Sequence, residues 1–137
     1  MTRQAAAGVI FDDDGRVLLV KENYGRRRYG FPGGAVEPGE APEDAVVREL
    51  KEETGVEVAV DHLIGLYRLE DGVPMLLFRC RIVAGTAAVP DTGEIAEVGW
   101  CKADDLPAPV TNLLHHALPD ALAGGRGVVR TGLRRLN

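Results

Sequence analysis

Four glutamates, one arginine and two glycines are spaced as a site for a metal ion and a phosphate group would require. The segment Gly34–Val56 follows the pattern G-x5-E-x7-R-E-U-x-E-E-x-G-U, in which U is an aliphatic residue. Carboxylate oxygens suit Mg²⁺ or Mn²⁺, and Mg²⁺ is commonly bound by a few carboxylates together with water and substrate phosphates. The charged positions of the pattern are Glu40, Arg48, Glu49, Glu52 and Glu53.

A helix over Ala41–Glu53 would position these side chains. The segment lacks glycine, its only proline is Pro42 at the start, and Gly55 follows its end, as helix termini prefer. At about 100° per residue, the three glutamates after Arg48 share an arc of roughly 100°. The adjoining arc is expected to be buried, and it holds Val46, Val47, Leu50 and Thr54.

A solvated face is the ordinary explanation for an acid-rich helix, and the metal site has to be weighed against it. Carboxylates at i, i+3 and i+4 destabilise a bare helix by about 0.2–0.5 kcal/mol per pair, and a bound cation would reverse that repulsion. Between Glu37 and Glu57 there are eight acidic and two basic residues, and the rest of the chain is almost neutral. This concentration favours the metal site.

The whole chain sets broader limits. Its 137 residues predict a single domain, residues 1–137, with one core. Two cysteines cannot make a disulfide framework, and the composition suits a reducing cytoplasm. No apolar run approaches the roughly 20 residues that span a bilayer, and no secretory leader is expected. The acidic isoelectric point of about 5.2 argues against binding a nucleic-acid polymer.

Strands and helices are expected to alternate. Ala5–Phe11 and Arg16–Val20 predict a hairpin around Asp14-Gly15, and Asp71-Gly72 predicts a second one. Lys21–Tyr29 is expected to be a loop. The sequence leaves open whether the glycine- and arginine-rich segment 124–137 docks or frays. The remaining expected elements are strands at Val56–Leu69, Met75–Val83 and Ile95–Cys101 and a helix at Val110–Leu118 that stops at Pro119.

The pattern resembles the signature of the Nudix hydrolases, with every fixed position filled. The resemblance covers the motif completely and, more loosely, roughly Ala5–Leu118. It implies an α/β fold, the Nudix-type α/β/α sandwich with a mixed β-sheet and a loop–helix–loop motif. It also implies divalent-metal-dependent hydrolysis of a pyrophosphate bond in a nucleoside diphosphate derivative, with Mg²⁺ or Mn²⁺ as cofactor.

The resemblance also implies roles for individual residues. Glu49, Glu52 and Glu53 correspond to the metal ligands of the family, and the carbonyl group of Gly33 often joins them. Arg48 would orient the motif glutamates by ion pairing. Glu40, in the same family pattern, supports the loop or an additional metal.

The general base is open between the motif helix and a carboxylate outside it. Glu49 is the candidate on the helix, by analogy with the family. Glu94 and Glu97 are candidates before Trp100, and Glu94 is favoured because it stands at the expected loop end. The alternative for both is an ordinary exposed strand residue.

Three residues outside the motif are predicted to bind substrate. Arg28, in the run of arginines before the glycine pair, could bind a phosphate, although a solvated basic loop is an equal alternative. Phe31 could stack on a base, although aromatic residues beside a glycine turn more often belong to the core. Asn112 could read a purine edge, as an asparagine in this region does in the MutT-type branch.

The sequence is compatible with several classes of substrate. The motif and the segment ADDLPAP are most similar to MutT-type enzymes, which convert a nucleoside triphosphate, oxidised or not, to a monophosphate and pyrophosphate. ADP-ribose or a nucleotide sugar is the alternative substrate class. A non-catalytic nucleotide sensor is a further alternative, although such domains usually lack one or more of the glutamates kept here. The resemblance to the family also implies a homodimer.

Overall fold

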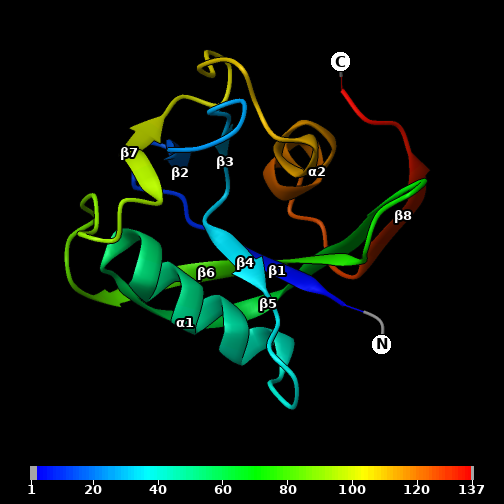
Figure 1. Cartoon of the computed structure of the whole chain (residues 1–137), viewed down its shortest axis with the longest axis horizontal. Helices are drawn as coiled ribbons and strands as arrows, with labels where there is room; N and C mark the ends of the chain where they lie inside the picture. The colour runs from blue at the N-terminus through cyan, green and yellow to red at the C-terminus, as the bar shows by residue number, and fades with distance from the viewer. Residues whose placement is uncertain (1–2, 137) are drawn as a thin grey trace.

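The computed structural model describes residues 3–136 and shows two β-sheets and two α-helices (Figure 1). The larger sheet, in the order β4-β1-β6-β5-β8, contains β1 (Ala5–Val9), β4 (Gly33–Ala35), β5 (Glu57–Leu69), β6 (Met75–Ala84) and β8 (Val128–Leu133). The smaller sheet, in the order β3-β2-β7, contains β2 (Val17–Glu22), β3 (Tyr29–Gly30) and β7 (Ile95–Cys101). The helices are α1 (Pro42–Thr54) and α2 (Asn112–Leu122).

The larger sheet is mixed and lies between the two helices. β1 runs parallel to β6 and β5 parallel to β8, whereas the other neighbours are antiparallel. In Figure 1 this sheet is seen close to its edge, with α1 on one side and α2 on the other. The expected α/β/α sandwich with a mixed sheet is therefore confirmed, and β4 places the glycine pair at an edge of this sheet.

Alternating side chains of the sheet supply two separate cores. Ala6 of β1 belongs to the cluster under α1, which includes Val46 and Leu50. Ala7, the next residue, belongs to the cluster under α2, which includes Leu114. Successive residues of a strand face opposite sides, so one short alanine-rich strand serves both helices.

The predicted turn at Asp12–Gly15 forms, but the two strands beside it belong to different sheets, so the pairing expected for the first hairpin is wrong, whereas the second hairpin is confirmed. β1 is bonded to β4 on one edge and to β6 on the other, so no edge is left for β2. β2 pairs with β3 and β7 instead. Near the turn, the two segments are joined by the Phe11–Val17 bridge and by bonds from Leu18 N–H to the Ile10 carbonyl and from Asp12 N–H to the Arg16 carbonyl. β5 and β6 form the antiparallel hairpin predicted around residues 71–72.

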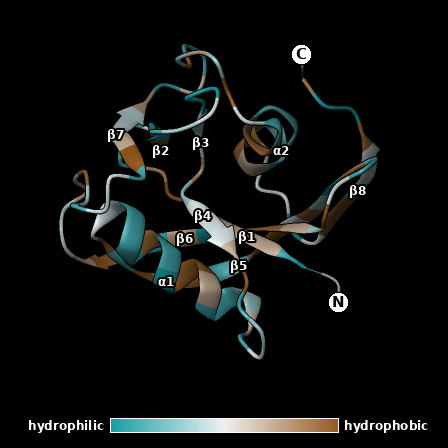
Figure 2. Cartoon of the chain, viewed as in Figure 1, coloured by the Kyte–Doolittle hydropathy of each residue, from teal (hydrophilic) through white to brown (hydrophobic). Residues whose placement is uncertain are grey.

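Helix α1 has the predicted ends, and one predicted core residue is misplaced. Pro42 is its first residue, and Gly55 ends it in the left-handed conformation with φ 79°. Val46, Leu50 and Thr54 are buried, but Val47 is 37% exposed. Val47 lies at the edge of the stripe that is farther from the carboxylates, and the expectation that it joins the core is wrong. Figure 2 shows the resulting division of the helix between hydrophilic and hydrophobic faces.

Helix α2 passes through Pro119, against the prediction that it stops there. A proline inside a helix typically costs about 3 kcal/mol because it removes a hydrogen bond and crowds the preceding turn. Leu118 and Ala121, on either side of it, are buried in the core beneath α2 and offset that cost. Neither helix in residues 3–136 combines the length and the hydropathy that a membrane crossing needs.

Candidate active site

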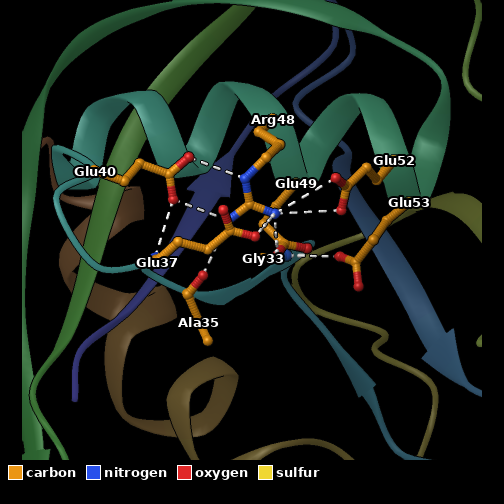
Figure 3. A network of polar contacts seen from close by, with 8 residues as sticks. All are labelled: Gly33, Ala35, Glu37, Glu40, Arg48, Glu49, Glu52 and Glu53. Carbon is orange, nitrogen blue, oxygen red and sulfur yellow. Dashed lines mark hydrogen bonds and ion pairs between the residues drawn. The ribbon is translucent and has the colours of Figure 1, made fainter.

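Arg48 is the centre of the polar network on α1 (Figure 3). Its Nε and Nη2 atoms donate to the two carboxylate oxygens of Glu40, each at 2.9 Å. Its Nη1 atom donates to Glu49 Oε1 at 3.0 Å and contacts Glu52 at 3.3 Å, and Nη2 also donates to the Ala35 carbonyl at 3.1 Å. The guanidinium therefore ties the loop after β4 to two of the predicted metal ligands.

This arrangement shifts the titration of both partners of the central ion pair. The hydrogen bonds from Arg48, with a further one from the backbone N–H of Glu37, lower the pKa of Glu40 to about 2. The carboxylates around Arg48, Glu40 above all, raise the pKa of its guanidinium. Both groups are thus charged at any physiological pH, which suits the orienting role that the motif predicts for Arg48.

Glu53 faces the glycine pair rather than Arg48. Its Oε1 atom accepts a hydrogen bond from the backbone N–H of Gly33 at 2.7 Å. Burial raises the pKa of Glu53 to about 8, and the nearby charges of Glu49, Glu94 and Glu52 contribute to the rise. Burial also raises the pKa of Glu49, although Arg48 opposes the effect. The site therefore concentrates more negative charge than its one arginine balances.

The two glycines are required by close approaches. A Cβ atom on Gly33 would collide with the backbone of Ala6 and Ala7 in β1. A Cβ atom on Gly34 would lie 2.6 Å from Glu49 Oε1, so any side chain there would displace that carboxylate. Gly33 was predicted to supply its carbonyl oxygen to a metal. The contact that the structure shows is made by its N–H group, and the metal role of the carbonyl stays a prediction.

The residues present fit a divalent cation by the chemistry of their donors. Glu49, Glu52 and Glu53 are oxygen donors on one side of a single helix. Burial, with a smaller contribution from the neighbouring carboxylates, raises the pKa of Glu53, and a bound cation would stabilise its charged form. Within residues 3–136, however, no three His, Cys, Asp or Glu side chains converge closely enough to hold an ion. The Arg48 and Gly33 donors hold the carboxylate oxygens apart, and a cation would replace part of these contacts.

Glu94 and Glu97, the two candidates for a base outside the motif, differ clearly in their surroundings. Glu97 forms an ion pair with Lys21 at 3.2 Å and accepts a hydrogen bond from Tyr29 at 3.0 Å, so its charge is already balanced. Glu94 is exposed at the start of β7, and its charge contributes to the raised pKa of both Glu49 and Glu53. Glu94 is therefore the carboxylate outside the motif that shares the electrostatic field of the site.

Asn23 holds the loop that carries Glu94. Its backbone N–H donates to the Glu94 carbonyl at 3.0 Å, and its side-chain amide donates to the Gly93 carbonyl at 2.8 Å. Its side-chain oxygen accepts from Arg27 Nη1 at 2.7 Å, which secures Arg27 in the left-handed region with φ 52°. Sequence reasoning missed Asn23, because no local pattern indicates a contact across 70 residues.

The three predicted substrate-binding residues line one pocket of about 320 Å³. Arg28, Phe31 and Asn112 come together there with Gly33 and Gly34, although they belong to different parts of the chain. Phe31 is buried, and Arg28 pairs with Glu22 at 3.0 Å. The pocket residues that sequence reasoning missed include Ala5, Ala7, Leu69, Val73, Met75, Thr111, Leu113 and Arg135.

The NUDIX domain family model matches residues 1–121 of this chain. The chain therefore belongs to the Nudix family. It is a Nudix pyrophosphohydrolase, a hydrolase that acts on acid anhydrides, and enzymes of this family act on small-molecule nucleotide derivatives.

The relatives bear names that differ in substrate. A MutT-like protein of Streptomyces ambofaciens is 34% identical over 128 residues, which cover 93% of this chain and 81% of that protein. A putative 8-oxo-dGTP diphosphatase of Bacillus subtilis is 33% identical over 107 residues, with coverages of 78% and 71%. An ADP-ribose pyrophosphatase of Methanocaldococcus jannaschii is 37% identical over 95 residues, with coverages of 64% and 56%. Family membership alone therefore does not give the substrate.

A solved Nudix hydrolase from Nitrosomonas europaea has the same fold. Its TM-score is 0.79 at 28% identity, and the superposition covers 93% of each chain. This likeness agrees with the α/β/α layers described above.

Proposed function

We propose that this chain hydrolyses a nucleoside triphosphate, with an ordinary or an oxidised base, to a nucleoside monophosphate and pyrophosphate. The observation that carries the proposal is the pocket of about 320 Å³ that adjoins the glycine pair beside Glu49 and Glu53. Pockets for small molecules commonly measure about 300–1000 Å³. A pocket at the small end of this range suits one nucleoside better than the two sugar-bearing groups of ADP-ribose or a nucleotide sugar.

The chemistry is assigned to the motif helix. Glu49, Glu52 and Glu53, with the carbonyl oxygen of Gly33, would hold Mg²⁺ or Mn²⁺. Such an ion, when bound, neutralises charge on the pyrophosphate and lowers the pKa of a bound water. Arg48 keeps Glu49 and Glu52 in place through the contacts at 3.0 and 3.3 Å.

The reaction itself is a displacement at phosphorus. A water oxygen forms a bond to one phosphorus, the bond from that phosphorus to the bridging oxygen breaks, and the proton of the water passes to a carboxylate. We assign the role of proton acceptor to Glu94, because its side chain is exposed and its charge contributes to the raised pKa of both Glu49 and Glu53. Glu49 is the alternative base on the helix. The contribution of the protein is mainly positioning and electrostatics.

Recognition of the nucleoside is assigned to the pocket. Phe31 would pack against the base, Asn112 would donate or accept a hydrogen bond at its edge, and Arg28 would contact a phosphate oxygen. Two further properties stay predictions, namely a homodimer and a cytoplasmic location.

A panel of nucleotides tests the proposal. Release of phosphate and pyrophosphate would be measured with Mg²⁺ or Mn²⁺ for ordinary and oxidised triphosphates, ADP-ribose, nucleotide sugars and dinucleoside polyphosphates. We expect metal-dependent pyrophosphate release from triphosphates that is slower by about 100-fold or more in Glu53→Gln. Preferred turnover of ADP-ribose, which the methanogen relative makes the second candidate, would contradict the proposed substrate. Binding of a nucleotide without turnover of any compound would instead support a sensor.

A further inference from the structure

The end of the chain lies beyond the family match but takes part in the fold. The NUDIX domain model matches residues 1–121, whereas β8 starts at Val128 and pairs in parallel with β5. Arg130 donates to both oxygens of Asp120, at 2.7 and 2.8 Å, and the buried hydroxyl of Tyr67 donates to the same carboxylate at 2.8 Å. β8 is thus anchored to both α2 and β5.

Residues 134–136, here called the C-terminal arm, then cross the start of α2. Leu136 N–H donates to Asn112 Oδ1 at 2.7 Å, and the Arg134 carbonyl lies 2.8 Å from His116 Nε2. Arg135 Nε donates to Asp71 at 2.9 Å, in the turn between β5 and β6. Three contacts therefore hold three successive residues in place, and Arg135 among them lines the substrate pocket.

The C-terminal arm supplies hydrogen-bond donors to that pocket. Arg135 and Asn112 line both the pocket beside the glycine pair and an adjoining hollow of about 310 Å³, which Arg26 and Arg28 also line. Neither lining contains an acidic residue. Leu136 N–H takes one of the two lone pairs of the Asn112 oxygen, and the structure shows no partner for the NH₂ group, so this group is the readier part of that side chain for a ligand. This end of the pocket presents donors and hardly any side-chain acceptor.

We propose that the C-terminal arm contributes to substrate specificity. In this proposal, Arg135 donates hydrogen bonds to an oxygen acceptor on the moiety bound in the pocket. The inference rests on the proposed function, because it takes the nucleoside to lie there. Guanidinium groups suit both a base carbonyl and a phosphate oxygen. The shared chemistry is an oxygen acceptor, and the experiment distinguishes its source.

Steady-state kinetics of the 137-residue chain with GTP and ATP tests this role of Arg135. Arg135→Ala is expected to raise KM for GTP about 5- to 20-fold, with kcat within twofold, because one good bidentate contact is worth roughly that factor or more. Arg134→Ala, the exposed neighbour that lines neither hollow, is the matched control and should leave KM unchanged. A rise for GTP alone assigns the acceptor to the base carbonyl, and an equal rise for both nucleotides assigns it to an oxygen that they share.

An unchanged KM for both nucleotides in Arg135→Ala would overturn the proposal. If the wild type turned over ADP-ribose and no triphosphate, the proposed substrate would be wrong. The KM for ADP-ribose of the same two variants would then test the role of Arg135.

Asn112→Asp provides a second test that keeps the arm in place. The aspartate can still accept from Leu136 N–H, but it replaces the NH₂ donor with a negative charge. We expect a larger rise in KM than in Arg135→Ala, with an unchanged melting temperature. If the variant melted normally and had the KM of the wild type, the claim that Asn112 donates a hydrogen bond to the bound moiety would be contradicted.

Discussion

The motif helix and the substrate pocket are built in opposite ways. Apart from Glu94, the carboxylates and the arginine that we assign to chemistry lie within residues 40–53, on one helix and the loop before it. The pocket draws on β1, the segment 28–34, the β5–β6 turn, the start of α2 and the C-terminal arm. The first region is local in sequence, and the second exists only after the chain has folded.

This difference explains why a shared reaction can serve many substrates. Most of the charge network lies on one helix and is completed by neighbouring groups of the segment 33–40. The substrate pocket is assembled from distant segments, and a change in any one of them, including the C-terminal arm beyond the family match, can alter it. Catalysis is thus assigned to the motif helix with Glu94, and specificity to the pocket, and each of the following changes should affect one of the two.

The largest effect is expected for Glu53→Gln. It removes a proposed metal ligand and keeps the shape of the side chain, so kcat should fall about 10²- to 10³-fold, as for loss of one electrostatic element of an active site. Glu43→Gln, an exposed acid in the first turn of the same helix, is the matched control and should retain full activity. A Glu53→Gln enzyme with normal kcat would remove that residue from catalysis.

Arg48→Lys should have the next largest effect. Lysine keeps the charge but cannot contact Glu40, Glu49, Glu52 and the Ala35 carbonyl with one planar group. Loss of residues that orient metal ligands typically costs about 10- to 100-fold. We expect kcat to fall by this factor, with weaker apparent Mg²⁺ affinity, measured by titrating the metal at saturating substrate. Unchanged metal dependence would show that Arg48 does not orient the ligands.

Asn23→Ala should lower kcat about fivefold to tenfold, with little change in KM, if Asn23 positions Glu94. A double-mutant cycle with Glu94→Gln is the measurement, because residues that act as one unit are not additive. Asn23→Ala should have no further effect when Glu94 is already replaced. Additive losses would indicate a merely structural role for Asn23.

The smallest effect is a pH dependence of stability without metal. The folded-state pKa of Glu53 is about 8, above its ordinary value of 4.5, so the folded protein binds the proton more strongly than the unfolded chain. Its contribution to stability is present below about pH 4.5 and is lost as pH rises towards 8. In EDTA at pH 8, Glu53→Gln should melt a few degrees above the wild type, and the difference should vanish at pH 4. A lower melting temperature for the variant at pH 8 would contradict the shift.

The same contrast sets how much could be predicted from the sequence. The motif and its helix were predictable, because spacing and periodicity act over a few turns, and the layers of the fold were implied by the resemblance of the motif to the Nudix signature. The pairing of β2 with β7 was not, because it depends on which edges of β1 other strands occupy. The passage of α2 through Pro119 depends on the burial of Leu118 and Ala121, which outweighs a local preference.

Arg28, Phe31 and Asn112 were predicted individually, and the structure places them in one pocket. Arg135 was not predicted, because its place depends on Asp71 and on the contact between Leu136 and Asn112, which span 64 and 24 residues of sequence. Whether any of these residues binds substrate stays a prediction.

The most direct test of the separation is to measure kcat and KM for one triphosphate in Glu53→Gln and Arg135→Ala side by side. We predict that Glu53→Gln lowers kcat about 100-fold or more with KM within about threefold. Arg135→Ala should raise KM and leave kcat within about twofold. If Arg135→Ala lost kcat as Glu53→Gln does, with KM unchanged, catalysis and specificity would not reside in separate regions of this enzyme.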